Sequence, residues 1–207
     1  GSRSPEEIRG FAEAIARYLI AQGVKLIVIA CNTVSAVALT HLRALFPQTP
    51  FVGMVPAVKP AVLATRSGVI GVLATPTTLA SQPYQDVVAR YARNVRVLSQ
   101  PSPGLADQVE AGDLDGPQTL ALVHRYVDPL VEAGADVLVL GCSHYPFLLP
   151  AFRRVLGTKV QLIEPSGAIA RQTRRVLQTK NLMRQGSASP EIVYATTGDP
   201  LKLSQAL

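Results

Sequence analysis

The segments Ala21–Thr33, AQGVKLIVIACNT, and Glu132–His144, EAGADVLVLGCSH, follow one pattern. In each, a helical pattern ends at a glycine, an apolar run of strand length follows, and a cysteine stands eight residues after the glycine. Each cysteine therefore lies just past the carboxyl end of a strand, where ligands bind in open α/β sheets. The repeat predicts two similar α/β halves that face each other across a cleft.

The remainder of the chain alternates in the same way. Short β-branched apolar runs predict buried strands at Lys25–Ala30, Phe51–Val55, Val69–Leu73, Val95–Ser99, Val137–Leu140, Val160–Ile163 and Ile192–Ala195. Helical patterns lie between most of these runs. Strands that are apolar throughout and alternate with helices are typical of α/β proteins with mostly parallel sheets.

Two helices have clear boundaries in the sequence. Ser4-Pro5-Glu6-Glu7 combines an N-cap, a proline at the first helical position and an acidic first turn. This helix is predicted to run to about Gln22 and to end at Gly23. Its expected inner face consists of Phe11, Ile15, Tyr18 and Leu19. A second helix is predicted over residues 118–133, before Gly134.

Composition limits the class of protein. The 207 residues are 48% hydrophobic, which is enough for a substantial core. No apolar run approaches the roughly 20 residues that a membrane span needs, and no signal peptide is visible at the N-terminus. We therefore expect a cytoplasmic protein with no membrane association.

The chain carries a formal net charge of +6. Its densest basic cluster is Arg171, Arg174, Arg175, Lys180 and Arg184. A nucleic-acid interface would add aromatic residues or a known binding motif, whereas aromatic residues are 5% of this chain. A solvated helix face is the simpler interpretation of the cluster.

The two cysteines, Cys31 and Cys142, allow three interpretations. A disulfide is disfavoured in a cytosolic chain. Buried structural thiols are common. Reactive thiols are the third possibility, and the matching strand-end positions with polar residues after each cysteine give it weight.

Two thiols would suit the inversion of an amino-acid Cα, which requires proton removal on one face and proton delivery on the other. A free cysteine has a pKa of about 8.5 that a suitable site can lower towards neutrality. His144, two residues after Cys142, is a candidate for that tuning. His41 and His124 fall within helical patterns and receive no role.

Hydroxyl and amide side chains follow the same strands. Asn32, Thr33 and Ser143 offer donors at strand–helix turns, an arrangement that suits carboxylates. Ordinary helix capping explains the same residue types, and both roles can hold together. Thr75, Thr77 and Thr78 follow the strand at 69–73 in the same way.

Metal binding is a competing chemistry. Cys31, Cys142 and His144 could provide three zinc ligands, but the CxxC or HxxxH spacing typical of zinc sites is missing from the sequence. GxGxxG, P-loop and GxSxG sequences are missing as well.

Taken together, these motifs resemble the glutamate racemase family. The resemblance is carried by Ala30-Cys31-Asn32-Thr33 and Gly141-Cys142-Ser143-His144-Tyr145-Pro146. Weaker matches extend over nearly the whole chain and comprise residues 18–24, 71–78, 109–112 and 196–200. The histidine after the second cysteine favours glutamate racemases over the more distant aspartate racemases.

The resemblance implies two pseudo-symmetric α/β domains with the active site between them. The first domain would contain residues 1–55 and 168–207, and the second residues 56–167. Cys31 would act on the D-enantiomer and Cys142 on the L-enantiomer, with Glu110 and His144 assisting at Cys142. No cofactor or metal is expected. Glutamate would be bound by Asn32, Thr33, Thr75, Thr78, Ser143 and His144.

The sequence departs from the family pattern in three places. The family opens with a strand and an Asp-Ser-Gly loop, followed by a Tyr-Gly pair, and neither of these has a counterpart here beyond a first glycine. The C-terminus stops inside the last expected helix, and Ser143 replaces a usual threonine. The resemblance therefore implies that these 207 residues alone are weakly active or inactive.

Other functions stay open at this point. An aspartate racemase or another two-cysteine isomerase is the nearest enzyme alternative, and a glutamate-binding or regulatory protein is the non-enzymatic one. The resemblance also raises a homodimer and a contact with DNA gyrase, for which the sequence offers no support beyond its basic charge. The product of the racemase reaction, D-glutamate, would supply peptidoglycan synthesis.

Overall fold

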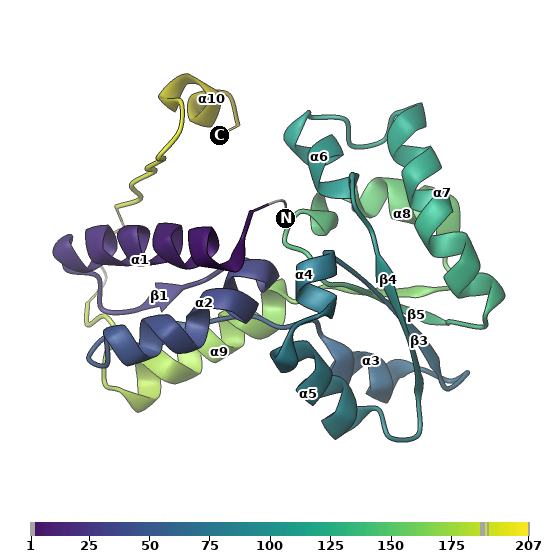
Figure 1. The fold of residues 1–207 in the computed structure, drawn as a ribbon, viewed down its shortest axis with the longest axis horizontal. Coiled ribbons are helices and arrows are strands. Elements are labelled where there is room, and N and C mark those ends of the chain that lie inside the picture. Colours follow the sequence, from purple (N-terminus) through teal and green to yellow (C-terminus); the bar gives the residue numbers. More distant parts are fainter. Residues whose placement is uncertain (1–2, 187–188, 190, 207) are drawn as a thin grey trace.

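The structure, a computed structural model, describes residues 3–186, 189 and 191–206. The described residues form two parallel sheets, as the alternation of strands and helices predicts (Figure 1). One sheet pairs β1 (Ile27–Val28) with β2 (Phe51–Val52). The other has the order β4 (Arg96–Pro101), β3 (Val69–Ala74), β5 (Val137–Leu140) and β6 (Gln161–Ile163).

The two-stranded sheet belongs to a half built from α1 (Pro5–Ala21), α2 (Asn32–Leu45) and the returning α9 (Ser166–Thr179). α1 begins with the predicted cap: Ser4 and Glu7 form reciprocal hydrogen bonds with each other's backbone N–H. Figure 1 shows α9 in the same half as β1, where it packs against β2. The chain therefore leaves this half after β2 and comes back to it after β6.

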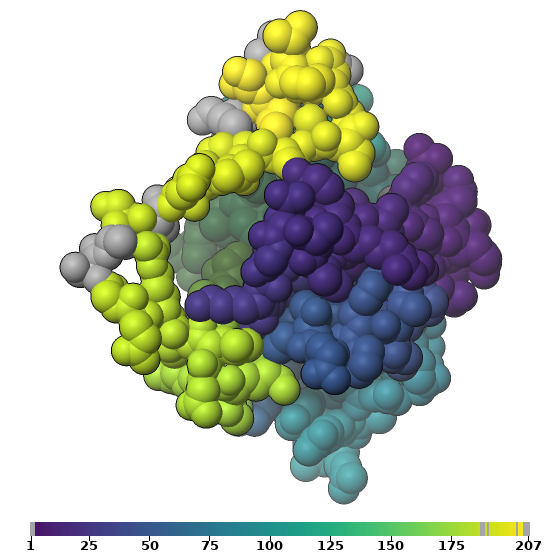
Figure 2. All heavy atoms as spheres, turned by 90° about the vertical axis from the view of Figure 1, so that its left-hand side faces the viewer, coloured from purple at the N-terminus to yellow at the C-terminus, as the bar shows by residue number. Residues whose placement is uncertain are grey.

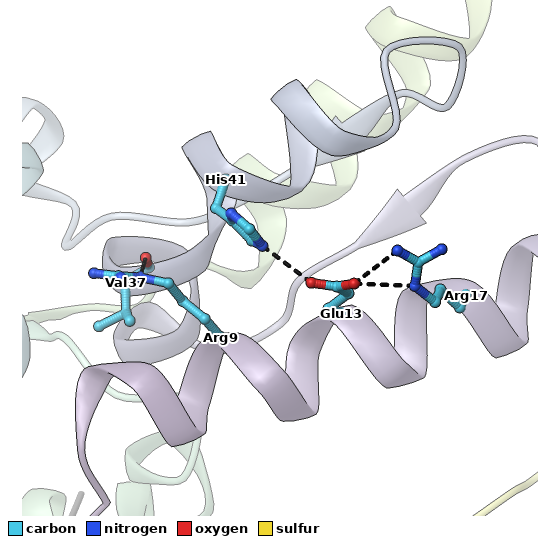
Figure 3. Close-up of polar contacts among 5 residues, drawn as sticks. All are labelled: Arg9, Glu13, Arg17, Val37 and His41. Atoms are coloured by element: carbon cyan, nitrogen blue, oxygen red, sulfur yellow. Dashed lines mark hydrogen bonds and ion pairs between the residues drawn. The ribbon is translucent and has the colours of Figure 1, made fainter.

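A carboxylate bridges α1 and α2 on the surface of the molecule (Figure 3). Glu13 accepts hydrogen bonds from Arg17, one turn along α1, at 2.7 Å, and contacts His41 Nε2 of α2 at 3.2 Å. Arg9 reaches the carbonyl of Val37 at 3.4 Å. Because these groups are exposed, they add little stability, and the packing of the two helices comes mainly from the apolar side chains beneath them.

The expected inner face of α1 is wrong for three residues. Phe11 and Tyr18 are each 53% exposed and Ile15 is 46% exposed. The helix instead packs through Ala16, together with Ala12, Leu19 and Ile20, because small alanine side chains allow α1 to approach α2 closely. Within the described residues β1 has β2 as its single partner strand, and the Arg3 guanidinium lies over the exposed Phe11 ring at 5.3 Å.

The four-stranded sheet is covered on both faces (Figure 1). Its central strands, β3 and β5, direct successive side chains to opposite faces. Leu73, Leu138 and Leu140 join one apolar cluster, and Ile70 and Val72 join the other. The first cluster packs under α6 (Leu105–Glu110), α7 (Pro117–Glu132) and α8 (Leu149–Leu156). The second packs under α3 (Val58–Ala64) and α5 (Gln82–Tyr91).

Asp136 ties the start of β5 to the loop before β3. Its carboxylate accepts hydrogen bonds from Thr65 Oγ1 and from the backbone N–H groups of Arg66 and Ser67, at 2.5, 2.7 and 2.9 Å. Although burial opposes the effect, these hydrogen bonds lower the pKa of Asp136 to about 2. The loop is thereby fixed to the sheet by a charged acceptor.

The C-terminal region differs from the sequence-based prediction. Residues 192–195 form no strand, and Ile192, Val193 and Tyr194 are exposed. A β-branched run forms a strand where a neighbouring strand accepts its hydrogen bonds, and among the described residues no strand pairs with this run. Figure 2 shows the segment, in yellow, arching away from α9 and over the end of α1 before α10 (Pro200–Ala206).

The predicted strand and helix boundaries otherwise hold, with shorter strands in the first half. β1 and β2 each keep two of their predicted residues, because a parallel pair without further partners forms few ladder hydrogen bonds. The division into residues 1–55 plus 168–207 and residues 56–167 stays a prediction. In the described residues no helix is long and apolar enough to cross a membrane.

Candidate active site

Both cysteines lie where the repeat places them. Cys31 is the N-cap of α2, three residues after β1, and its side chain makes no capping hydrogen bond. Cys142 follows β5 and Gly141, and precedes the 3-10 helix η1 (Tyr145–Leu148). Both thiols are free, and both therefore lie past the carboxyl ends of parallel strands.

A chain of polar contacts begins at Cys142. Cys142 Sγ lies 3.8 Å from His144 Nδ1, and His144 Nε2 lies 2.5 Å from Glu110 Oε1. Glu110 is the last residue of α6, so the helix brings a carboxylate to the turn after β5. These three residues, each a predicted catalytic group, are thus brought together.

The contacts change the charge of the imidazole. The hydrogen bond with Cys142 raises the pKa of His144 to about 9, with Glu110 acting in the same direction and partial burial acting against both. At neutral pH the ring is therefore cationic and can donate from both nitrogen atoms. The ring thus presents a positive charge towards the Cys142 sulfur.

Three threonine hydroxyls join the two halves of the molecule. Thr33 Oγ1, at the start of α2, lies 2.9 Å from Thr75 Oγ1 and 3.2 Å from Thr78 Oγ1. Thr75 is the N-cap of the short helix α4 (Pro76–Leu79) and accepts from the Thr78 N–H. Capping and the predicted substrate role therefore fall on the same side chains.

Asn32 has an unusual environment for an amide. Its side chain is 2% exposed, and neither its Oδ1 nor its Nδ2 has a hydrogen-bond partner. It occupies the first turn of α2, whose leading N–H groups lack intrahelical partners as in every α-helix. A buried amide without partners costs on the order of 1–3 kcal/mol, which is unusual in a native protein unless a ligand completes it.

The residues of the candidate site line two different cavities. One of about 570 Å³ is lined by Ser143 and Pro146 after β5, by Ala30 and Met54 of the first half, and by one face of α9. Another, of about 200 Å³, is lined by Asn32, Thr78 and the residues that follow β2. Ser143 and Asn32 thus lie on different cavities between the halves.

The two cysteines differ in their surroundings. Cys142 has His144 two residues later, whereas Thr33 holds that position after Cys31. Among the residues that the structure describes, no hydrogen bond joins Cys31 to an ionisable side chain. The described residues also contain no group of three His, Cys, Asp or Glu side chains placed to hold a metal ion. The alternative of zinc on Cys31, Cys142 and His144 therefore gains no support.

Sequence analysis missed two residues behind Cys142. The Tyr145 hydroxyl lies 2.9 Å from Ser102 Oγ and donates to the Ser102 carbonyl at 3.0 Å, and both side chains are buried. Tyr145 directly follows the Cys-Ser-His triplet, and Ser102 lies three residues after the strand predicted at 95–99. Proximity to the motif was a signal for Tyr145, but their pairing depends on the order of β4 and β5 in the sheet.

Comparison with known proteins places this geometry in a family. The family model for Asp/Glu/hydantoin racemases matches residues 1–173. A glutamate racemase of Roseiflexus sp. is 51% identical over 208 residues, covering the whole chain and 76% of that relative. A glutamate racemase of Deinococcus radiodurans is 47% identical over the whole chain and 72% of its own length. The chain belongs to the glutamate racemase family.

Solved glutamate racemases share the fold. The enzyme of Francisella tularensis, in complex with D-glutamate, matches with a TM-score of 0.83 and 29% identity over 97% of this chain and 75% of its own. The Escherichia coli enzyme, with L-glutamate and the activator UDP-MurNAc-Ala, matches with a TM-score of 0.77 and 32% identity over 86% and 67%. The chain is thus an α/β racemase that spans about three quarters of the length of the first of these relatives.

Proposed function

We propose that this racemase interconverts L-glutamate and D-glutamate, without a cofactor, through two thiols that act on opposite faces of Cα. The observation that carries the proposal is the contact chain from Cys142 through His144 to Glu110. A binding protein has no need of a thiol beside a cationic imidazole. The relatives named for glutamate support the choice of substrate.

In the direction from L to D, the Cys142 thiolate takes the Cα proton and becomes a thiol. The electron pair of the broken C–H bond stays on Cα, stabilised by the adjacent carboxylate group. The Cys31 thiol then delivers its own proton to the opposite face, forms the new C–H bond and is left as a thiolate. Proton exchange with solvent restores the starting state, and the reverse reaction exchanges the two roles.

The substrate carboxylates require donors, and the site offers several. The leading N–H groups of α2 and the Asn32 amide are available to an anion at the helix N-terminus. Thr33, Thr75 and Thr78 present hydroxyls from both halves, and Ser143 adds another beside Cys142. A ligand that engages these groups would hold the halves together during proton transfer.

The test is incubation with L-glutamate in deuterated water at high protein concentration. Two thiols predict that D-glutamate appears with deuterium at Cα while the remaining L-glutamate is initially unlabelled. Cys31→Ala and Cys142→Ala should each abolish formation of the D-enantiomer. Failure to label glutamate, together with labelling of aspartate, would overturn the substrate. Absence of labelling in both, also in a version extended at both ends, would favour a binding protein.

Other partners of the chain stay predictions. The proposed partner is a small molecule, glutamate. A homodimer and a contact with DNA gyrase, which the resemblance raised, stay predictions, as does a cytoplasmic location. The D-glutamate formed by the proposed reaction would supply peptidoglycan synthesis.

A further inference from the structure

Two hydroxyls beneath the turn after β5 form a buried network. Tyr145 is fully buried and Ser102 is 1% exposed. Ser102 Oγ also lies 3.3 Å from the Ala74 carbonyl oxygen, so the two hydroxyl protons are shared among three contacts. Burial raises the pKa of the Tyr145 hydroxyl well above its usual range, so it remains a neutral donor. Each hydroxyl therefore has the partners that burial demands.

This network joins the carboxyl ends of three strands. Ser102 directly follows β4, and its backbone N–H donates to Ala74, the last residue of β3, at 3.1 Å. Tyr145 stands three residues after Cys142 and donates its N–H to the Cys142 carbonyl at 3.2 Å. The Ser102–Tyr145 pair thus connects the ends of β3 and β4 to the turn that follows β5.

The Ser102–Tyr145 pair lies next to both segments that carry the His144–Glu110 contact. His144 is the neighbour of Tyr145, and α6, which ends at Glu110, begins three residues after Ser102. α6 is about 9 Å long at 1.5 Å per residue, so a displacement at its start is carried to Glu110.

The His144–Glu110 contact is too exposed to hold itself in place. The Glu110 side chain is 73% exposed and the His144 side chain 34%. Exposed ion pairs contribute little to stability, whereas hydrogen bonds between buried hydroxyls and carbonyls constrain a structure more strongly, because water cannot replace them there. The buried pair is therefore the stronger constraint on this region.

We propose that Ser102 and Tyr145 are positioning residues that set the alignment of Glu110, His144 and Cys142. The inference rests on the proposed function for its catalytic meaning, because it concerns the surroundings of the Cys142 thiol. Neither side chain needs to touch the substrate, and Cys31, which lies in the other half, is outside the network.

The test uses Tyr145→Phe and Ser102→Ala, with two readouts that need no turnover. NMR titration follows the His144 ring, and mass spectrometry follows alkylation of each cysteine at neutral pH. In both variants we expect the His144 pKa to move from about 9 towards 6.5. Alkylation of Cys142 should slow by about three- to tenfold as the imidazole loses its place beside the sulfur, with Cys31 unchanged.

Tyr84→Phe is the matched control. Tyr84 is also a buried tyrosine of this half, and its hydroxyl contacts Ser99 Oγ of β4 rather than the Cys142 turn. This control should change neither readout. Ser102→Thr, which keeps the hydroxyl, should leave the His144 pKa and the alkylation of Cys142 at their parent values. Variants that lose stability yet keep the parent His144 pKa and Cys142 reactivity would overturn the positioning role.

The two proposals fail separately. If the parent protein labels neither enantiomer of glutamate but Tyr145→Phe still moves the His144 pKa, the positioning role stands and the reaction does not. If glutamate is labelled in the parent and the variants keep its rate and both readouts, the reaction stands and the positioning role is wrong.

Discussion

His144 Nε2 lies 2.5 Å from Glu110 Oε1 although 34 residues separate the two side chains in the sequence. The contact places a carboxylate at the far side of an imidazole whose other nitrogen faces the Cys142 sulfur. Because the Glu110 carboxylate stabilises the cationic form of His144, Glu110 acts on the Cys142 sulfur indirectly, through the charge of the imidazole ring. The geometry therefore assigns Glu110 to the Cys142 half of the reaction.

Glu110→Gln should weaken proton transfer at Cys142. The amide keeps the size of the side chain but removes the negative charge, so the pKa of His144 should fall from about 9. We expect kcat to fall by about tenfold, a part of the usual contribution of general acid–base groups, with a small effect on KM. Steady-state kinetics with each enantiomer measures both constants, and an unchanged kcat would contradict the role of Glu110.

The raised pKa of His144 also predicts a pH dependence of stability. The folded protein holds this proton more tightly than the unfolded chain, in which the pKa is 6.5, whereas the folded value is about 9. The stabilisation is therefore complete below the unfolded pKa and is lost as the pH rises through the folded pKa. Urea unfolding of the parent and of His144→Gln, at pH values below, between and above the two pKa values, should show a difference that shrinks with rising pH.

The repeat explains why much of the architecture is predictable from sequence. Gly23 and Gly134 end helices with φ of 76° and 92°, a region that glycine adopts readily. The apolar runs after them have no polar side chain to expose, which places them inside a sheet. Parallel strands of one sheet end at the same edge, so each cysteine stands at the carboxyl edge of its own sheet, Cys31 after β1 and Cys142 after β5.

The wrong predictions concern contacts that a local pattern does not contain. Phe11, Ile15 and Tyr18 have helical spacing, but which face of a helix is buried depends on what lies opposite it. The run at Ile192–Tyr194 has β propensity without a partner strand. The Ser102–Tyr145 pair joins residues 43 positions apart, and its contact depends on the order of the strands in the sheet.

Asp136→Asn should destabilise the half that contains Cys142. The carboxylate accepts three hydrogen bonds in one loop, and its loss should lower the free energy of unfolding by about 1–2 kcal/mol at neutral pH. Because the pKa is lowered from 3.8 to about 2, the contribution is present above the unfolded value and lost as the pH falls through the folded one. Asp128→Asn, at an exposed site on α7, is the control and should change stability by less than about 0.5 kcal/mol.

Gly141→Ala should displace Cys142. A Cβ at this position would lie 2.8 Å from the Leu73 carbonyl oxygen and 2.9 Å from Ala74 Cβ, so the end of β5 would have to move. We expect a loss of about 1–3 kcal/mol in stability and a fall in kcat beyond that of the control. The control is Gly10→Ala on α1, where a Cβ meets nothing within 4 Å and helix propensity predicts a gain of about 0.5–1 kcal/mol.

Asn32→Leu should raise the stability of the protein and weaken its binding of glutamate. The buried amide has no partner in the free protein, and replacing it with an apolar side chain of similar size removes a cost of about 1–3 kcal/mol. We therefore expect the variant to unfold at a higher temperature than the parent, because the parent keeps an unsatisfied amide at the start of α2. The same change should weaken glutamate binding by at least about tenfold, since it removes a donor and an acceptor from the helix N-terminus. Calorimetry measures the unfolding, and titration with glutamate measures the binding.

Ser35→Ala is the comparison, because Ser35 is buried in the same helix but its hydroxyl is satisfied by the Ile29 carbonyl and the Met54 N–H. Its removal should therefore destabilise the protein. A destabilised Asn32→Leu variant with unchanged glutamate affinity would show that the amide serves the fold and not the ligand.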